Sequence, residues 1–159
     1  MAHPHRLQDY LLEQDIPFDL LTHQPSESSL GTAMAARIPM IQLAKAGMLE
    51  DHESKRLMAI LPASYKISIH RLNNEFHRKF HLIKESALGG MFEDCEPGAV
   101  PPGAQAYHLD MIFDDVLSKQ PDIYLEAGDH QTLIHLTHDA FDRFVTHAKH
   151  GRFSRQIYH

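Results

Sequence analysis

Lys45 is the residue whose type and surroundings point most directly to chemistry. On a strand, residues 41, 43, 45, 47 and 49 share one face, and the four that accompany Lys45 are apolar or glycine. An ammonium group there either reaches the edge of the sheet along its apolar stem, or lies in a pocket that expects an anion. The pattern alone favours the edge and leaves the pocket open.

A second candidate is the proline-rich loop 98–102, which has the spacing G-x-x-x-P. Gly98 allows a ligand to approach the backbone closely, and the prolines restrict the loop so that its free amides keep fixed directions. Such amides can bind a carbonyl oxygen or stabilise an oxyanion. A tight structural turn is the alternative interpretation.

A third candidate is the predicted turn 126–130, which offers a carboxylate, a glycine and an imidazole. His130 could act as a general base or as a hydrogen-bond donor. Alternatively, Gly128 and Asp129 serve only the hairpin turn. Cys95 is a nucleophile by type, but no His/Asn signature surrounds it, so we expect a spectator thiol.

The elements that must position these residues mix helices and strands without a βαβ rhythm. Apolar periodicity and capping residues predict helices at 6–14, 28–36, 69–76 and 85–92 and after Thr137. Strands are expected at 16–22, 41–49, 56–61, 80–83, 109–113, 123–125 and 133–136, the last two as a hairpin. This order indicates an α+β fold with a mixed, strongly bent β-sheet flanked by helices.

The length of 159 residues is typical of a single domain. We expect one domain over 1–159, with a core at about 7–148 and a tail at 149–159 that is frayed or contacts another copy. One cysteine excludes an internal disulfide and fits a reducing compartment. Neither a secretory signal nor an apolar run of ~18 residues is present. We therefore expect a cytoplasmic protein that does not enter a membrane.

The net charge of −6 argues against a protein that coats nucleic acid by bulk electrostatics. The charge is uneven, however. Residues 66–84 hold five Lys/Arg and one acid, and residues 143–159 hold four Lys/Arg and no acid. A local basic face is therefore possible, although the charge pattern alone favours ordinary solvated helix faces.

Fourteen histidines are many for this length. Several lie at helical spacing, but no cysteine or carboxylate completes an obvious ligand set, and no HExxH motif is present. We expect no metal site; a histidine-based metal protein is the least favoured hypothesis.

Taken together and in order, these features resemble the YbaK/EbsC family, also called the prolyl-tRNA-synthetase-associated or editing-insertion domain. The resemblance runs from about Leu7 to about Val145. The segments that carry it are Ile16-Pro17-Phe18, His23-Gln24-Pro25, 41–45, Leu61-Pro62-Ala63, the loop 96–102 and the glycine turn 126–132.

The resemblance implies an aminoacyl-tRNA deacylase that acts in trans on the ester of a mischarged tRNA, and so serves translation fidelity. It implies no metal and no cofactor, because the lysine holds the terminal nucleotide, the loop orients the ester carbonyl and the ribose hydroxyl assists attack. The catalytic positions implied are Lys45, Gly98 and Pro102. The positions implied to contact the substrate are Ala99, Val100, Glu126, Gly128 and His130.

One departure from the family pattern affects this expectation. Many members have threonine or asparagine after the lysine, whereas Ala46 and Gly47 follow it here. The alternative hypothesis is therefore a catalytically silent module of the same fold that senses tRNA, a nucleotide or an amino acid. The partners implied are the acceptor end of aminoacyl-tRNA and an aminoacyl-tRNA synthetase, while the amino acid and the oligomeric state stay open. We expect Lys45, Gly98 and Gly128 to converge on one concave site.

Overall fold

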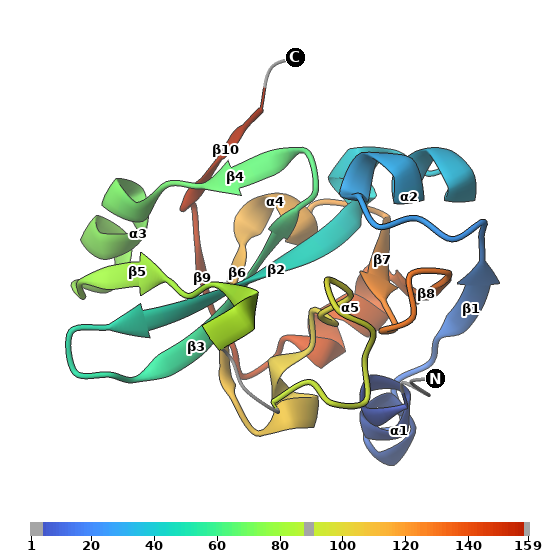
Figure 1. Cartoon of the computed structure of the whole chain (residues 1–159), viewed down its shortest axis with the longest axis horizontal. Coiled ribbons are helices and arrows are strands. Elements are labelled where there is room, and N and C mark those ends of the chain that lie inside the picture. Colours follow the sequence, from blue (N-terminus) through green and yellow to red (C-terminus); the bar gives the residue numbers. More distant parts are fainter. Residues whose placement is uncertain (1–4, 88–90, 158–159) are drawn as a thin grey trace.

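A mixed β-sheet forms the centre of the molecule in the computed structural model, which describes residues 5–87 and 91–157. Its strands run in the order β1-β8-β7-β2-β3-β6-β9, and β5 pairs with the far end of β2 (Figure 1). Their bounds are β1 (Asp19–Thr22), β2 (Leu43–Asp51), β3 (Arg56–Pro62), β5 (Phe80–Leu82), β6 (Asp110–Asp114), β7 (Asp122–Glu126), β8 (Thr132–Thr137) and β9 (Lys149–Gly151). A second, two-stranded sheet joins β4 (Tyr65–Ile67) to β10 (Ser154–Gln156).

The antiparallel hairpin of β2 and β3 forms the centre of the sheet. It contains seven residue pairs, from Ala44 opposite Pro62 to Glu50 opposite Arg56. β3 is buried along nearly its whole length, as its run of apolar residues predicts. On its other edge, β2 pairs with β7 only at residues 43–44 and with β5 only at residues 49–51. In the described part of the chain, residues 45–47 therefore have no strand on that edge.

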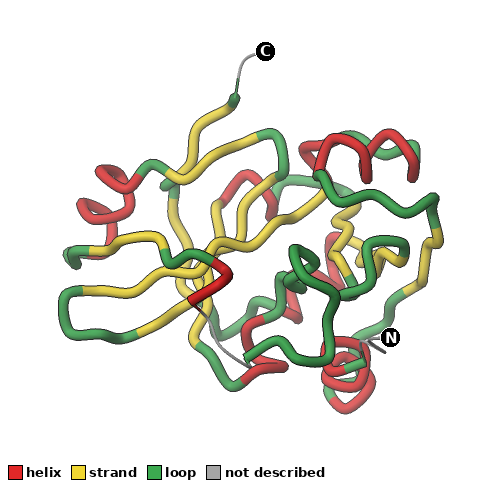
Figure 2. Tube along the Cα trace, in the orientation of Figure 1, coloured by secondary structure: helices red, strands yellow, loops and turns green. Residues whose placement is uncertain are grey.

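Helices surround this sheet (Figure 2). They are α1 (Arg6–Glu13), α2 (Ser29–Ala36), α3 (Ile69–Phe76), α4 (Asp115–Ser118) and α5 (His138–Phe144). Polar side chains cap them as their sequences predict: the Ser28 hydroxyl accepts from the Gly31 amide at 3.0 Å, and the Thr137 hydroxyl accepts from the Ala140 amide at 3.2 Å. The caps fix where α2 and α5 begin, and α2 borders the cavity described below.

The core consists of separate apolar clusters on different sides of the sheet. The largest packs α1 and α5 against the strands, with Leu11 and Phe141 fully buried. A second cluster lies under α3 and contains Leu72 and Phe153. A third joins Ala33 of α2 to Leu43 of β2. β2 contributes to all three clusters, because its two faces and its two ends meet different helices.

The end of the chain differs from the prediction of a tail outside the core at 149–159. β9 pairs with β6 in parallel and β10 pairs with β4 antiparallel, while Phe153 between them is fully buried. The cause is Asp114, a buried carboxylate that accepts hydrogen bonds from the amides of Phe153 at 3.0 Å and Ser154 at 2.9 Å. The core thus extends to the C-terminal strand.

The α+β fold with one domain and a mixed sheet is confirmed, and most differences concern element boundaries. The helix expected at 85–92 is a single 3-10 turn at Glu85–Ala87, and residues 88–90 of that prediction lie outside the described residues. β4, α4, β9 and β10 were not predicted. In the described ranges, the helices are all too short or too polar to span a bilayer.

Candidate functional site

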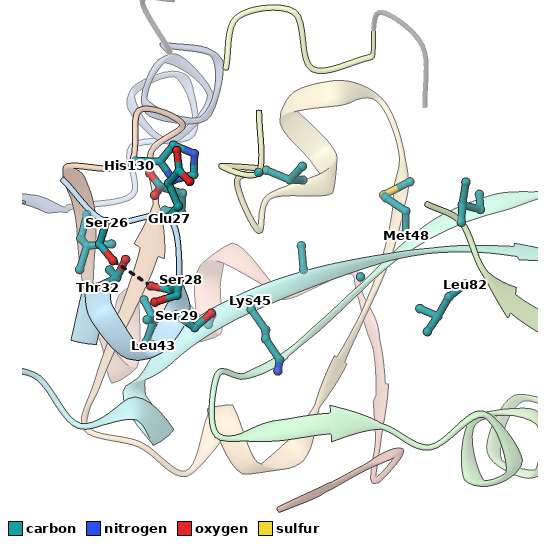
Figure 3. A pocket seen from close by; sticks show the side chains of 18 residues that line it. Ser26, Glu27, Ser28, Ser29, Thr32, Leu43, Lys45, Met48, Leu82 and His130 are labelled. Atoms are coloured by element: carbon teal, nitrogen blue, oxygen red, sulfur yellow. Dashed lines mark hydrogen bonds between the residues drawn. The ribbon is translucent and has the colours of Figure 1, made fainter. Parts of the chain in front are cut away.

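A cavity of about 400 Å³ opens along the edge of β2 that carries no neighbouring strand. Five parts of the chain that are distant in sequence surround it (Figure 3). They are the segment that leads into α2, strand β2, the end of β5, the proline-rich loop and the hairpin of β7 and β8. The lining residues from these and adjoining segments are Ser26, Glu27, Ser28, Ser29, Thr32, residues 43–48, Leu82, Ile83, Gly98, Val100, Glu126, His130 and Leu133.

Five of the sequence-predicted site residues line this cavity: Lys45, Gly98, Val100, Glu126 and His130. The remaining three are buried and do not line it: Ala99, Pro102 and Gly128. Of the three positions expected to converge, Lys45 and Gly98 line the cavity and Gly128 does not.

Lys45 combines the two positions that its sequence pattern allowed. Its half-buried side chain leaves β2 on the side away from Glu27 and His130 (Figure 3). Its ammonium donates a hydrogen bond of 3.2 Å to the carbonyl oxygen of Ala63, which is its one hydrogen-bond partner among the described residues. Burial lowers the pKa of Lys45. Since an ammonium has three donors, two remain for a ligand.

The two small residues after Lys45, Ala46 and Gly47, make different packing contacts. Ala46 packs beside the largest apolar cluster, to which Met48 also belongs. At Gly47, an added Cβ atom would approach Cδ1 of Ile67 to 2.8 Å, closer than real Cβ contacts come. The Ile67 side chain of β4 therefore packs directly over Gly47, and the neighbouring wall of the cavity is apolar.

The proline-rich loop presents one amide without a partner. Ala99 donates to the carbonyl oxygen of Glu96 at 3.1 Å, which closes a turn, and the two following prolines have no amide hydrogen. The Val100 amide has no hydrogen-bond partner among the described residues. Gly98 adopts the left-handed region with φ of +81°, as its place in the turn requires. Within 99–102, the sequence prediction of several free amides thus reduces to Val100.

His130 is fixed by the same loop. Its Nε2 lies 2.5 Å from the carbonyl oxygen of Pro97. A carbonyl oxygen only accepts, so Nε2 donates, and Nδ1 of the neutral ring is left as an acceptor. The His130 carbonyl accepts from the Ser26 amide at 3.0 Å, and this bond ties the segment before α2 to the turn. His130 therefore connects two walls of the cavity.

Glu126 places a half-buried carboxylate in the cavity. Its Oε2 accepts a 2.8 Å hydrogen bond from the Gly128 amide. Burial is the main cause that raises the pKa of Glu126, the charge of Asp129 adds to it, and the Gly128 bond and His130 oppose it. The carbonyl of Gly128 accepts from the Glu96 amide at 2.7 Å. Gly128 thus positions both the carboxylate and the loop, rather than contacting a ligand itself.

Cys95 and the described histidines other than His130 do not line the cavity. The Cys95 Sγ lies 3.2 Å from the hydroxyl of Tyr107, and burial raises the pKa of the thiol to about 12, so it stays protonated. In the described ranges, one group of three metal-ligating side chains is close enough to share an ion: His138, Asp139 and Asp142, all exposed at the start of α5. These three residues do not line the cavity.

Sequence reasoning missed the wall that precedes α2. Ser26 and Glu27 line the cavity, as does Thr32 within α2, yet in this segment only Ser28 and Ser29 were interpreted, as a helix cap. Ser28 does cap α2, so that prediction was correct as far as it went. The signal available was Glu27, an acid in a short serine-rich segment directly before a helix of apolar residues.

Together, the bent mixed sheet and the cavity at the open edge of β2 define an α+β domain with a candidate ligand site of mixed polarity. The model of the aminoacyl-tRNA editing domain matches residues 23–144. The chain belongs to this family, and the matched region contains all the lining residues. A search of curated proteins found no match.

Solved structures share the fold at low sequence identity. The hypothetical protein APE2540 superposes with a TM-score of 0.82 at 14% identity, covering 94% of this chain and 99% of its own. A proposed trans-editing enzyme for prolyl-tRNA synthetase gives 0.78 at 12%, covering 96% of each chain. A proposed signal-transduction protein from Marinobacter aquaeolei VT8 gives 0.76 at 14%, covering 95% of this chain and 30% of its own.

Proposed function

We propose that this protein is an aminoacyl-tRNA deacylase that hydrolyses the ester of a mischarged tRNA in trans. One observation carries the proposal: in a chain of the editing-domain family, a single cavity holds a cation, an unpartnered loop amide and a half-buried carboxylate at Lys45, Val100 and Glu126. These are the groups that a charged 3′ end needs, because it carries a phosphate, an ester carbonyl and an ammonium group.

Each end of the cavity suits one part of this substrate. On the proposal, Lys45 binds the terminal phosphate and ribose through its two remaining donors. Glu126 binds the α-ammonium group, and His130 completes that end through Nδ1. The amino-acid side chain lies against the apolar wall formed by Met48 and Ile83, both of which line the cavity.

Hydrolysis then requires little beyond positioning. Water attacks the ester carbon, and a tetrahedral oxyanion forms. The bond to the ribose oxygen then breaks, and the free amino acid is released with its carboxylate. The amide of Val100 donates to the developing oxyanion, a type of contact worth roughly 100- to 1000-fold in rate. Ala99, Gly98 and Pro102 keep that amide in place. The ribose hydroxyl beside the ester assists the attack, so no metal or cofactor enters the proposal.

A silent binding module is the second candidate function, and Ala46 is the observation that favours it. No polar side chain follows Lys45 on β2, so one contact to the ribose or ester is missing. Gly47 adds nothing to this alternative, since the packing of Ile67 explains it. For the deacylase and for the silent module, the proposed partners are the acceptor end of tRNA and an aminoacyl-tRNA synthetase that delivers it. The proposed location is the cytoplasm.

A panel of mischarged tRNAs separates the two functions. Release of free amino acid is measured for wild type, for Lys45→Ala and for the control Lys119→Ala. The Lys119 side chain is exposed and forms no ion pair with the described residues. The deacylase predicts that at least one tRNA is turned over by wild type and Lys119→Ala, and far more slowly by Lys45→Ala. Binding of tRNA without turnover of any member of the panel would identify the silent module.

A further inference from the structure

The small sheet formed by β4 and β10 holds two cations side by side. Its antiparallel register sets Arg155 directly opposite Lys66, and both side chains are exposed. Like charges directly opposite each other destabilise a strand pair. Neither side chain forms an ion pair with any residue in the described ranges. The pair therefore has a stability cost that the fold itself does not explain.

This ribbon, β4 with β10, unites the two basic stretches of the sequence. Residues 66–84 and 143–159 are separate in the chain, and each carries a net charge of +4. The strand pairing brings their ends together, and a guanidinium nitrogen of Arg71 donates to the carbonyl oxygen of Ser154 at 3.4 Å. Arg78 and Arg152 of these stretches pair with Asp51 and Asp114, whereas Lys66 and Arg155 form no ion pair with the described residues. The two cations of the ribbon are thus available to an anion.

The ribbon leads directly to the cavity. The Ile157 amide after β10 donates to the carbonyl oxygen of Ser64 at 2.8 Å, and the preceding residue, Ala63, accepts the hydrogen bond of the Lys45 ammonium. The Lys45 side chain points to this side of β2 and away from His130, with the β4 strand below it in Figure 3. Ser64 and Tyr65 lie between Ala63 and Lys66, and residues 63–64 form the turn that joins β3 to β4. Lys66 therefore follows, three positions later in the chain, the residue that binds the Lys45 ammonium.

We propose that the β4–β10 ribbon is an RNA-backbone surface, on which Lys66 and Arg155 contact phosphates of the nucleotides leading to the 3′ end held at Lys45. The family model ends at residue 144, so β10 lies outside the region that the model matches. The inference rests on the proposed function, because it identifies the ligand of the cavity as the end of an RNA strand. The proposed surface also explains the direction of the Lys45 side chain, because its ammonium would face the incoming RNA backbone while Glu126 faces the amino acid.

Direct binding of an uncharged RNA hairpin with a single-stranded 3′ end tests the surface. Affinity is measured between about 50 and 200 mM salt for wild type, Lys66→Gln and Arg155→Gln. Each substitution is expected to weaken binding roughly fivefold to tenfold near 0.1 M salt, and to reduce the slope of log affinity against log salt by about one. Lys66→Arg keeps the charge and is expected to bind like wild type.

The matched control is Lys55→Gln, which removes one positive charge at the β2–β3 turn, where Lys55 pairs with Glu53 at 3.5 Å. It is expected to change affinity less than twofold. Equal losses in Lys55→Gln and Arg155→Gln would assign the effect to net charge and overturn the proposal, as would unchanged binding in both ribbon variants. Thermal melting of each variant checks that it is folded.

Deacylation by the same samples keeps the two proposals apart. Turnover of a mischarged tRNA by wild type decides the proposed function, whereas RNA affinity alone decides the surface. A wild type that binds the hairpin through the ribbon yet releases no amino acid supports the surface and refutes the deacylase. If wild type releases amino acid while the ribbon variants bind RNA normally, the deacylase is supported and the surface is refuted.

Discussion

The ammonium of Lys45 lies 3.2 Å from the carbonyl oxygen of Ala63, on the side of β2 away from His130. Lys45 and Glu126 both line the cavity, and among the described residues they form no ion pair with each other. Each charge stays available to a ligand. A molecule that carries a negative and a positive group fits these two charges, and an aminoacylated 3′ end has both.

Substitution of Lys45 tests the cationic end. Lys45→Met keeps the apolar stem and removes the charge, so we expect kcat/KM for a mischarged tRNA to fall about 10- to 100-fold, the loss of one charge-assisted hydrogen bond. Stability is expected to hold or rise, because burial lowers the pKa of Lys45 and so opposes its charge in the folded state. Thermal melting and single-turnover hydrolysis measure the two effects. A variant as active as wild type would remove Lys45 from the site.

Substitution of Glu126 tests the opposite end. Glu126→Gln keeps an acceptor for the Gly128 amide but loses the negative charge. We expect the preference for esters with a free ammonium group over N-acetylated ones to shrink roughly tenfold or more, since a charged contact becomes neutral. Comparing both esters on wild type and variant measures this. An unchanged preference would show that another group binds the ammonium.

The same substitution has a pH-dependent effect on stability. Burial raises the pKa of Glu126 above its ordinary value. A raised folded pKa contributes stability that is present below the unfolded pKa and is lost as pH rises through the folded pKa. At pH 7 the charged carboxylate therefore costs stability, and Glu126→Gln is expected to raise the free energy of unfolding by about 0.5–2 kcal/mol. Toward pH 4 the difference should shrink, and denaturant unfolding at both pH values checks it.

Residue types and spacing predicted five residues that line the cavity, because several of them carry a local signal in the sequence. Lys45 stands out on an apolar face, and Gly98 lies in a proline-rich turn that needs a left-handed residue. The roles of Ala99 and Gly128 could not be predicted, since they depend on which hydrogen bonds form with Glu96. Glu27 was missed for a similar reason: only the contact between its segment and His130 brings it to the cavity.

The central hairpin and most helices were predictable from periodicity and caps, whereas the C-terminal ribbon was not. The residues of β10, Ser-Arg-Gln, have no apolar alternation that would predict a strand. Its place depends on Asp114, a carboxylate about forty positions earlier in the chain that binds the amides of Phe153 and Ser154. Long-range polar contacts of this kind leave no local signal.

Gly98→Ala tests the shape of the loop. An alanine at φ of +81° is strained by roughly 1–2 kcal/mol, and its Cβ would lie 3.4 Å from the His130 ring. We expect a lower melting temperature together with a loss of turnover. The double variant with His130→Ala separates the causes: a loss of stability that persists is backbone strain, and one that disappears is the ring contact. Full activity in Gly98→Ala would contradict a positioning role for the loop.

Asp51 predicts how the protein responds to acid. Burial opposes its ionisation, but hydrogen bonds from the Lys55 amide, the Arg78 guanidinium and the Glu53 amide outweigh it and lower its pKa to about 2. A depressed folded pKa contributes stability that is present above the unfolded value near 4 and is lost as pH falls toward 2. Asp51→Asn is therefore expected to destabilise at pH 7 and to flatten the acid-unfolding curve below pH 4. Glu13→Gln, at an exposed site, should leave that curve unchanged.

Substitution of Phe153 tests whether the end of the chain belongs to the core. Its ring is fully buried in the cluster with Leu72, and it packs edge-on against Phe76 with centroids 6.2 Å apart. Phe153→Ala should therefore lower the free energy of unfolding by about 3–5 kcal/mol. Arg155→Ala, two residues further and exposed, should change it by less than about 0.5 kcal/mol. If residues 149–157 were a frayed tail, both variants would melt like wild type. A large loss in Phe153→Ala and little change in Arg155→Ala would place residue 153 in the core, directly before the strand in which Arg155 lies opposite Lys66.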